Sequence, residues 1–171
     1  MPDTEVREPI DELAQRLGAV LVARDWRTAT AESCTGGGIA EAITRIAGAS
    51  AWFDQGFVPY TNAAKHRQLG VPEATIEHHG AVSAATVEAM VTGALTHSEA
   101  DIAVAVSGVA GPGGGTPTRP VGTVWFAWAR RGERGEAQAM HFNGDRADVR
   151  EQTVRHALEG LISVAEEPGP R

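Results

Sequence analysis

The chain has 171 residues, 42% of them hydrophobic and 22% charged, a composition typical of one ordinary globular domain. Its formal net charge is −7 and only 5% of its residues are aromatic, which disfavours a nucleic-acid polymer as partner. It contains one cysteine, no apolar leader and no run long enough to cross a membrane, so we expect a cytoplasmic protein that does not act at a membrane.

The first half of the chain predicts alternating helices and strands. Helical spacing of leucines and valines predicts a helix over 10–25, and a short β-branched run predicts a buried strand over 27–31. A glycine-rich turn at 32–38 precedes a helix over 39–47. A strand is expected within 51–60, ending at Tyr60, followed by short helices over 62–69 and 72–78.

The second half predicts a central strand and a hairpin between two helices. A helix is expected over 83–98 with Ser83 as its N-cap, and the apolar run 101–106 is a central strand. A long loop over 107–120 leads to two strands, 121–129 and 137–142, and the chain closes with a helix over 145–164. The order predicts a three-layer α/β/α sandwich with a mixed sheet, as one domain over 1–171 with flexible ends at 1–9 and 166–171.

The turn AESCTGG at 31–37 is the first candidate for chemistry. A turn between a strand and a helix leaves amide N–H groups free, and these can stabilise an oxyanion. Ser33, Cys34 and Thr35 are all candidate nucleophiles, and the glycines let a substrate approach the backbone. Helix capping is the more common role of hydroxyl residues at the start of a helix, and a lone cysteine such as Cys34 is more often a small buried hydrophobe.

The segment YTNAAK at 60–65 is the second candidate. A lysine acts as a base only when burial or a nearby cation lowers its pKa, and most lysines are instead solvated. Lys65 is the single lysine of the chain, since every other cationic side chain is an arginine. That choice suggests a role for a removable proton at this position.

Two further segments have the chemistry of an anion site. The loop SGVAGPGGGTPTRP at 107–120 follows a central strand and could present amides to a phosphate, or be a plain surface loop. Arg146 and Arg150 lie four residues apart at the start of the closing helix, where cations oppose the helix dipole. An anion between them, or pairing with Asp145, Asp148 or Glu151, would account for this. The scattered histidines predict no metal site.

These segments together resemble the CinA C-terminal domain family. The blocks are AESCTGG at 31–37, YTNAAK at 60–65 with LGV at 69–71, GAVS at 80–83, SGVAGPGG at 107–114, PVGT at 120–123 and FNGDR at 142–146. The resemblance covers residues 10–163. Departures are Ser107 in place of threonine, Gly113 in place of aspartate or serine, Arg119 in place of lysine, and Pro59 in place of a small residue.

The resemblance implies hydrolysis of nicotinamide mononucleotide to nicotinate mononucleotide and ammonia, in pyridine nucleotide recycling and without a cofactor. It implies Ser33 as nucleophile and Lys65 as base, with Tyr60 and Thr35 beside them. The expected substrate contacts are Glu32, Cys34, Gly36, Gly37, Asn62, Ser107, Gly111, Gly113, Gly114, Arg146 and Arg150. The chain is similar to the stand-alone form, without a molybdopterin-binding-like domain, and a homo-oligomer is expected.

Two other functions remain open at this level. An amidase with Cys34 as nucleophile would use Glu32 and Lys65 beside it. A non-catalytic nucleotide-binding or regulatory module of the same fold would bind the nucleotide without releasing ammonia, although the sole lysine favours catalysis.

Overall fold

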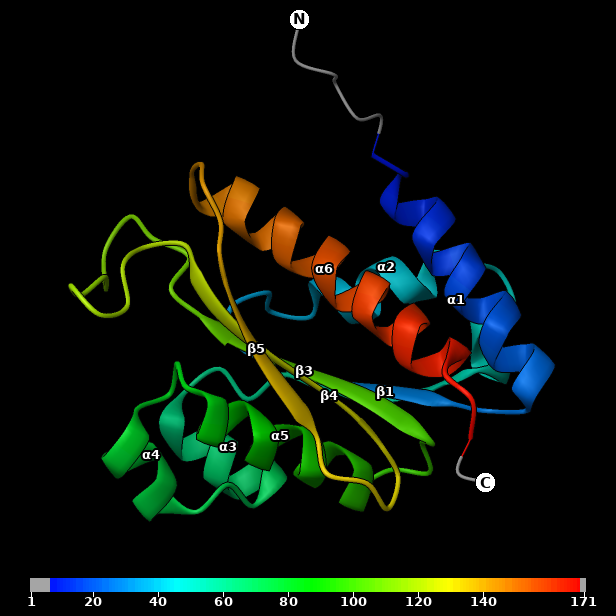
Figure 1. Cartoon of the computed structure of the whole chain (residues 1–171), viewed down its shortest axis with the longest axis horizontal. Helices are drawn as coiled ribbons and strands as arrows, with labels where there is room; N and C mark the ends of the chain where they lie inside the picture. Colours follow the sequence, from blue (N-terminus) through cyan, green and yellow to red (C-terminus); the bar gives the residue numbers. More distant parts are fainter. Residues whose placement is uncertain (1–6, 170–171) are drawn as a thin grey trace, which may run out of the picture.

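Five strands form a single mixed sheet in the computed structural model, which describes residues 7–169. The strands are β1 (Thr28–Glu32), β2 (Phe53–Phe57), β3 (Ile102–Gly108), β4 (Thr123–Arg130) and β5 (Glu136–His141). Their spatial order is β2-β1-β3-β4-β5, with β1 parallel to β2 and β3, and with β4 antiparallel to β3 and β5. Helices cover both faces (Figure 1), which confirms the predicted α/β/α sandwich.

One face of the sheet is covered by α1 (Ile10–Arg24), α2 (Gly38–Thr44) and the long α6 (Arg146–Glu166). Large side chains at alternating strand positions meet these helices, as the pleat requires: Ile102, Val104, Val106, Val124, Phe126 and Trp128. The Trp128 indole N–H donates to the Ala157 carbonyl of α6 at 3.1 Å. This contact fixes α6 over β4, the strand that follows the candidate anion loop.

The other face is covered by α3 (Asn62–Leu69), α4 (Glu73–His79) and α5 (Ala84–Thr96). The strand residues that point to this side are small: Ala29, Ala31, Ala103, Ala105 and Ala127. Alanines let α5 pack close to the sheet, and α5 in turn supports α3. Gly93 of α5 lies against the backbone of Leu69 at the end of α3, where a Cβ atom would overlap the Leu69 carbonyl.

Most predicted elements agree with the structure, and α3 has the predicted bounds. Tyr60 does not end a strand, because β2 stops at Phe57 and Pro59 lacks the N–H that a strand ladder needs. The predicted loop 107–120 is displaced, since Ser107 and Gly108 still belong to β3 and pair with β4. Helix α2 ends at Thr44, and a 3₁₀ turn, Ala49–Ala51, precedes β2.

The predicted flexible ends fall only partly within the described residues. Residues 7–9 precede α1 without regular structure, and Glu166 is the last residue of α6 rather than part of a tail. Residues 1–6, 170 and 171 of those predicted ends lie outside the described part.

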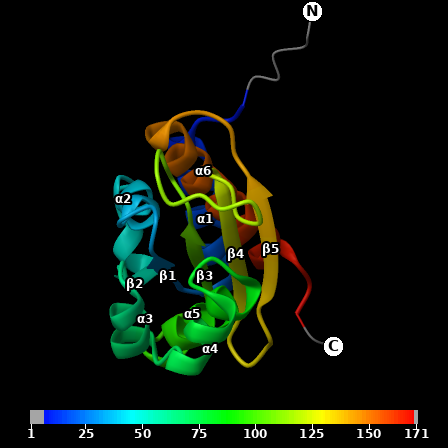
Figure 2. The same ribbon diagram turned by 90° about the vertical axis from the view of Figure 1, so that its left-hand side faces the viewer.

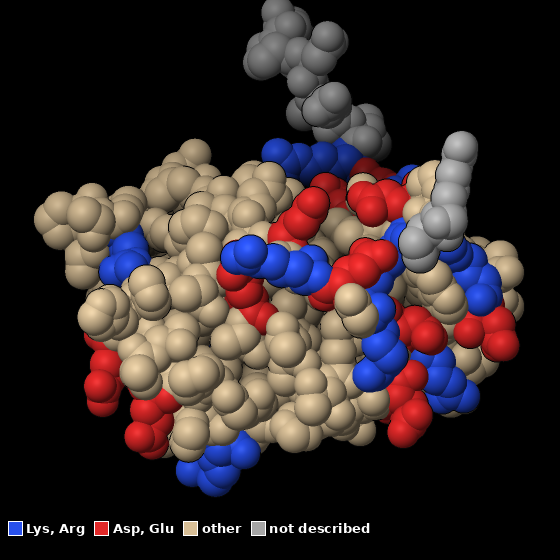
Figure 3. All heavy atoms as spheres, turned by 60° about the horizontal axis from the view of Figure 1, so that its bottom comes forward, with Lys and Arg blue, Asp and Glu red and all other residues tan. Residues whose placement is uncertain are grey.

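Charged side chains of both signs are mixed on the face shown in Figure 3, and no continuous basic area crosses it. Within residues 7–169, no helix combines the length and apolar character that a membrane crossing requires.

Candidate active site

The candidate nucleophile and base follow two neighbouring parallel strands. Ser33 comes directly after β1, and Lys65 lies in α3, the first helix after β2. Parallel strands end at the same edge of a sheet, so the topology brings these two segments together. Figure 2 looks onto the end of the sheet where loop 109–122, in yellow-green, lies between α6 and the α4–α5 pair.

Lys65 and Ser33 are in direct contact. The Lys65 Nζ atom lies 3.0 Å from Ser33 Oγ and also donates to the carbonyls of Pro59 and Tyr60, both at 3.2 Å. Ser33 Oγ is 3.3 Å from the Tyr60 carbonyl. The Thr61 side chain accepts from the Ala64 N–H and caps α3, which fixes the start of the helix that carries the lysine.

Burial sets the chemistry of this pair. Lys65 is 1% exposed and Ser33 is 7% exposed. The contacts of the ammonium are neutral oxygens, and no described carboxylate forms an ion pair with it. Removal from water therefore lowers the pKa of Lys65 below its ordinary value of 10.5. A lysine of lowered pKa is more readily neutral, and a neutral amine can accept a proton from a hydroxyl.

A pocket of about 260 Å³ opens onto the pair. This volume is small for a ligand site and suits one ring or a comparably small group. Seven of the predicted site residues line it: Ser33, Cys34, Tyr60, Asn62, Lys65, Ser107 and Arg146. The structure thus brings together residues from the turn after β1, from α3, from the end of β3 and from α6.

The remaining predicted site residues do not line this pocket. They are Glu32, Thr35, Gly36, Gly37, Gly111, Gly113, Gly114 and Arg150. The Glu32 carboxylate is fully buried and accepts from the Thr35 hydroxyl at 2.6 Å and from the N–H groups of Ile39 and Ala40. The Glu32 carboxylate and the Thr35 hydroxyl therefore bind each other under the turn.

Cys34 lines the pocket but is poorly suited to attack a substrate. Burial raises the pKa of its thiol to about 12, and the nearby Glu32 carboxylate acts in the same direction. The nucleophile of a cysteine enzyme is the thiolate, which this environment suppresses at neutral pH. The geometry therefore favours Ser33 over Cys34.

The two arginines at the start of α6 bind backbone carbonyls and a phenol. Arg146 donates to the Gly111 carbonyl at 2.9 Å and to the Tyr60 hydroxyl at 3.2 Å, so it joins the glycine loop to the pocket rim. Pairing with the nearby acids is not the explanation, because Asp145 and Asp148 form the capping box of α6 and no described ion pair involves either arginine.

Four lining residues had no predicted role: Ala81, Val82, Gly108 and Ala110. Arg119 holds one wall in place by donating to the carbonyls of Val82 and His79, each at 2.6 Å. The GAVS block at 80–83 was the one sequence signal near this wall, but it contains no side chain with obvious chemistry. Within residues 7–169, no group of three His, Cys, Asp or Glu side chains is placed to hold a metal.

Comparisons with known proteins identify the family of the chain. A family model described as the CinA C-terminal domain matches residues 10–165. A Pseudomonas putida protein named nicotinamide-nucleotide amidohydrolase PncC is 58% identical over 160 residues, 94% of this chain and 99% of that protein. The protein of the same name from Escherichia coli K12 is 48% identical over 161 residues, 94% of this chain and 95% of that one.

Solved structures give the same result for the fold. A competence/damage-inducible protein CihA from Agrobacterium tumefaciens superposes with a TM-score of 0.91 at 46% identity, covering 94% of this chain and 98% of that one. A CinA superfamily protein from Klebsiella pneumoniae gives 0.88 at 46% identity, covering 92% and 98%.

Proposed function

The chain belongs to the CinA C-terminal domain family, and on that premise we propose that it converts nicotinamide mononucleotide to nicotinate mononucleotide and ammonia. Such an activity would recycle pyridine nucleotide. The chain is a hydrolase of an amide C–N bond, as the names of its full-length relatives say. The observation that carries the proposal is the 3.0 Å contact between Lys65 Nζ and Ser33 Oγ at the base of a small pocket.

The first half of the proposed reaction forms an acyl-enzyme. Neutral Lys65 takes the proton of Ser33 while Oγ bonds to the carboxamide carbon, and the carbonyl electron pair moves onto oxygen. The tetrahedral intermediate collapses by breaking the C–N bond. Protonated Lys65 gives its proton to the departing nitrogen, which leaves as ammonia. Positioned proton transfer of this kind contributes roughly 10²–10⁴-fold to the rate.

The second half returns the enzyme to its starting state. Lys65, neutral again, takes a proton from water, whose oxygen bonds to the acyl carbon. Collapse breaks the bond to Ser33 Oγ, and the proton on Lys65 returns to that oxygen. The products are the pyridine carboxylic acid nucleotide and free Ser33.

Turn amides are the proposed oxyanion donors. The N–H groups of Cys34 and Thr35 donate to no other described residue, whereas the Gly36 N–H donates to the Ser33 carbonyl at 3.1 Å. The Cys34 and Thr35 N–H groups are therefore the proposed donors. Each such donor is worth about 10²–10³-fold in turnover.

The nucleotide phosphate is proposed to contact Arg146 at the pocket rim, because Arg146 is the permanently charged cation among the lining residues. Asn62 and Ser107 supply neutral polar groups to the lining of the same pocket. The glycines 36, 37, 111, 113 and 114 are not among the residues that line the pocket.

Ammonia release from nicotinamide mononucleotide tests the proposal. The wild type should release ammonia, and Ser33→Ala and Lys65→Ala should lose roughly 10²–10⁴-fold in kcat. Arg146→Ala should raise KM for the nucleotide more than for nicotinamide riboside, which lacks the phosphate. Wild-type turnover in either dyad variant would exclude the dyad, and tight nucleotide binding without ammonia would identify a non-catalytic module instead.

A further inference from the structure

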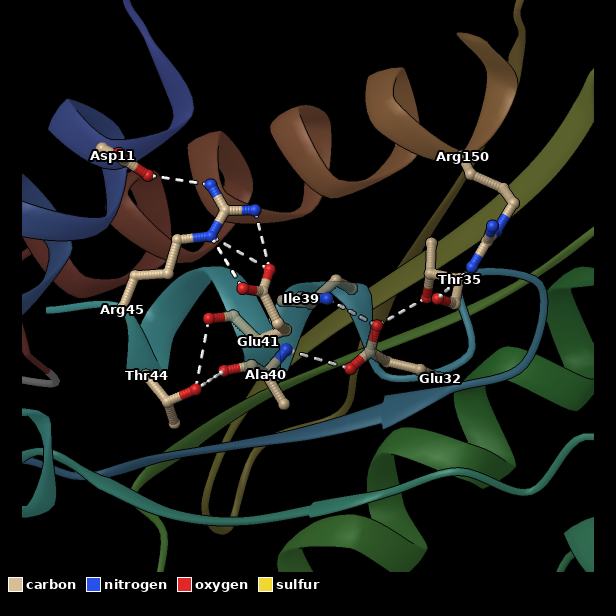
Figure 4. A network of polar contacts seen from close by, with 9 residues as sticks. All are labelled: Asp11, Glu32, Thr35, Ile39, Ala40, Glu41, Thr44, Arg45 and Arg150. Atoms are coloured by element: carbon tan, nitrogen blue, oxygen red, sulfur yellow. Dashed lines mark hydrogen bonds and ion pairs between the residues drawn. The ribbon is translucent and has the colours of Figure 1, made fainter. Parts of the chain in front are cut away.

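The turn that carries Ser33 is held from outside by Arg150. Its Nε atom donates to the Cys34 carbonyl and its Nη2 atom to the Thr35 carbonyl, both at 3.2 Å. In Figure 4 the Arg150 side chain descends from α6 onto Thr35. The arginine does not line the pocket, so its guanidinium group is directed at the backbone of the turn.

The same turn is held from inside by Glu32. Its carboxylate accepts from the Thr35 hydroxyl at 2.6 Å and from the N–H groups of Ile39 at 2.7 Å and Ala40 at 3.0 Å (Figure 4). Charge-assisted bonds of this kind are short and strong. Thr35 is thus held at two points: its hydroxyl donates to Glu32, and its carbonyl accepts from Arg150 of α6.

Peptide planarity converts these contacts into a direction for one N–H group. In a trans peptide the C=O of one residue and the N–H of the next point in opposite directions. The bond from Arg150 to the Cys34 carbonyl therefore turns the Thr35 N–H away from the guanidinium. The Thr35 carbonyl also accepts from the Gly38 N–H at 3.0 Å, so the Cys34 carbonyl is the one that depends on Arg150 alone.

We propose that Arg150 is a positioning residue that aims the Thr35 N–H at the developing oxyanion, and that it does not bind the substrate phosphate. The inference rests on the proposed function for the identity of the substrate. It replaces the expectation that Arg150 contacts the nucleotide, because Arg150, unlike Arg146, does not line the pocket and its guanidinium lies against the backbone of the turn.

The test compares Arg150→Ala, Arg150→Lys and the matched control Arg155→Ala in two assays. Arg155 lies on the same helix, but it donates to the Glu8 carbonyl and not to the turn that carries Ser33. The first assay gives kcat and KM for ammonia release from nicotinamide mononucleotide. The second gives the rate at which a fluorophosphonate labels Ser33, measured by mass spectrometry. In that labelling the Oγ–P bond forms, fluoride leaves and Lys65 takes the proton, while the phosphoryl oxygen occupies the oxyanion position.

Arg150→Ala should lower both kcat and the labelling rate about ten- to a hundredfold, because an aimed donor is lost in part. KM should stay within about twofold, as expected for an interaction made in the transition state. Arg150→Lys, with a single donor group, should fall between, and Arg155→Ala should match the wild type.

Three results would overturn the inference: a raised KM with unchanged kcat, an unchanged labelling rate in Arg150→Ala, or a wild type whose Ser33 is not labelled. The proposed function can fail separately. Suppose that the wild type releases no ammonia from nicotinamide mononucleotide, but that Ser33 is labelled faster in the wild type than in Arg150→Ala. This result would disprove the proposed substrate and support the positioning role of Arg150.

Discussion

Two buried cations lie at opposite ends of the sheet and do different work. Lys65 lies at the end of the sheet where β1 leads into the turn that carries Ser33. Arg130 lies at the other end, where it is the strand partner of Ile102 at the start of β3. Both are almost fully buried, at 1% and 7% exposure. Both donate mainly to backbone carbonyls, although Arg130 Nη2 also lies 4.0 Å from a carboxylate oxygen of Glu167. Burial alone therefore does not distinguish them.

The chemistry of the two head groups does distinguish them. Arg130 donates to the carbonyls of Val164, Glu167 and Pro168 and so binds the end of α6, with Trp26 beside its guanidinium. A guanidinium keeps its proton at any accessible pH, whereas a buried ammonium can lose it. The arginine end of the sheet therefore serves stability, and the lysine end can serve proton transfer.

Exchanging the two head groups gives the largest expected effect. Lys65→Arg retains the charge but removes the titratable proton, so kcat for ammonia release should fall roughly 10²–10⁴-fold. Arg130→Lys should leave kcat near the wild-type value and lower the free energy of unfolding by about 1–3 kcal/mol, because charge-assisted bonds to α6 are lost.

Steady-state kinetics of both variants give kcat for ammonia release, and urea unfolding gives their free energies of unfolding. Retained turnover in Lys65→Arg would show that the two cations are equivalent and would break the comparison.

Removing the buried amine altogether sharpens the comparison through stability. Lys65→Met should be inactive yet raise the free energy of unfolding by about 1–3 kcal/mol at pH 7, because an unpaired buried cation is costly. The pKa of Lys65 in the folded protein lies below its ordinary value of 10.5, which applies to the unfolded chain. Between these two pKa values the unfolded chain binds more protons than the folded protein, so the stability of the wild type rises with pH. The advantage of Lys65→Met should therefore shrink as pH approaches 10.5.

Urea unfolding at several pH values measures this advantage. A constant difference between variant and wild type would mean that Lys65 is not destabilised by burial.

The smallest expected effect concerns Cys34, which shares the pocket with Lys65. Burial favours the neutral form of both groups, but the neutral amine is the reactive base and the neutral thiol is the unreactive form. With a thiol pKa of about 12, iodoacetamide at pH 7 should neither modify Cys34 nor reduce turnover. Mass spectrometry and the ammonia assay check this together, and rapid inactivation with modification at Cys34 would restore the cysteine mechanism.

Sequence predicts the parts of this molecule that local chemistry determines. The bounds of α3 follow from Thr61, whose side chain caps the helix, and from Gly70, whose φ of 69° ends it in the left-handed region. Ser83 caps α5 for the same reason. Local sequence leaves Ser33, Cys34 and Thr35 open as nucleophiles, and the family resemblance implies Ser33 together with Lys65, the single lysine of the chain.

The roles of Glu32 and Arg150 could not be predicted in the same way. Arg150 and Cys34 are separated by 116 residues, and their contact depends on how α6 crosses the sheet. Glu32 is the last residue of a buried strand, and its partners are amides of a helix that begins at Gly38. Such contacts are set by the relative placement of whole elements, which no local pattern specifies.

Gly93 has a wider consequence. It lets α5 touch the backbone of Leu69, one helical turn beyond Lys65, more closely than any side chain would permit. The alignment of amine and hydroxyl is thus governed partly by a hydrogen atom on a distant residue that takes no part in proton transfer. The position of Lys65 relative to Ser33 therefore depends on the close packing of α5 against the end of α3.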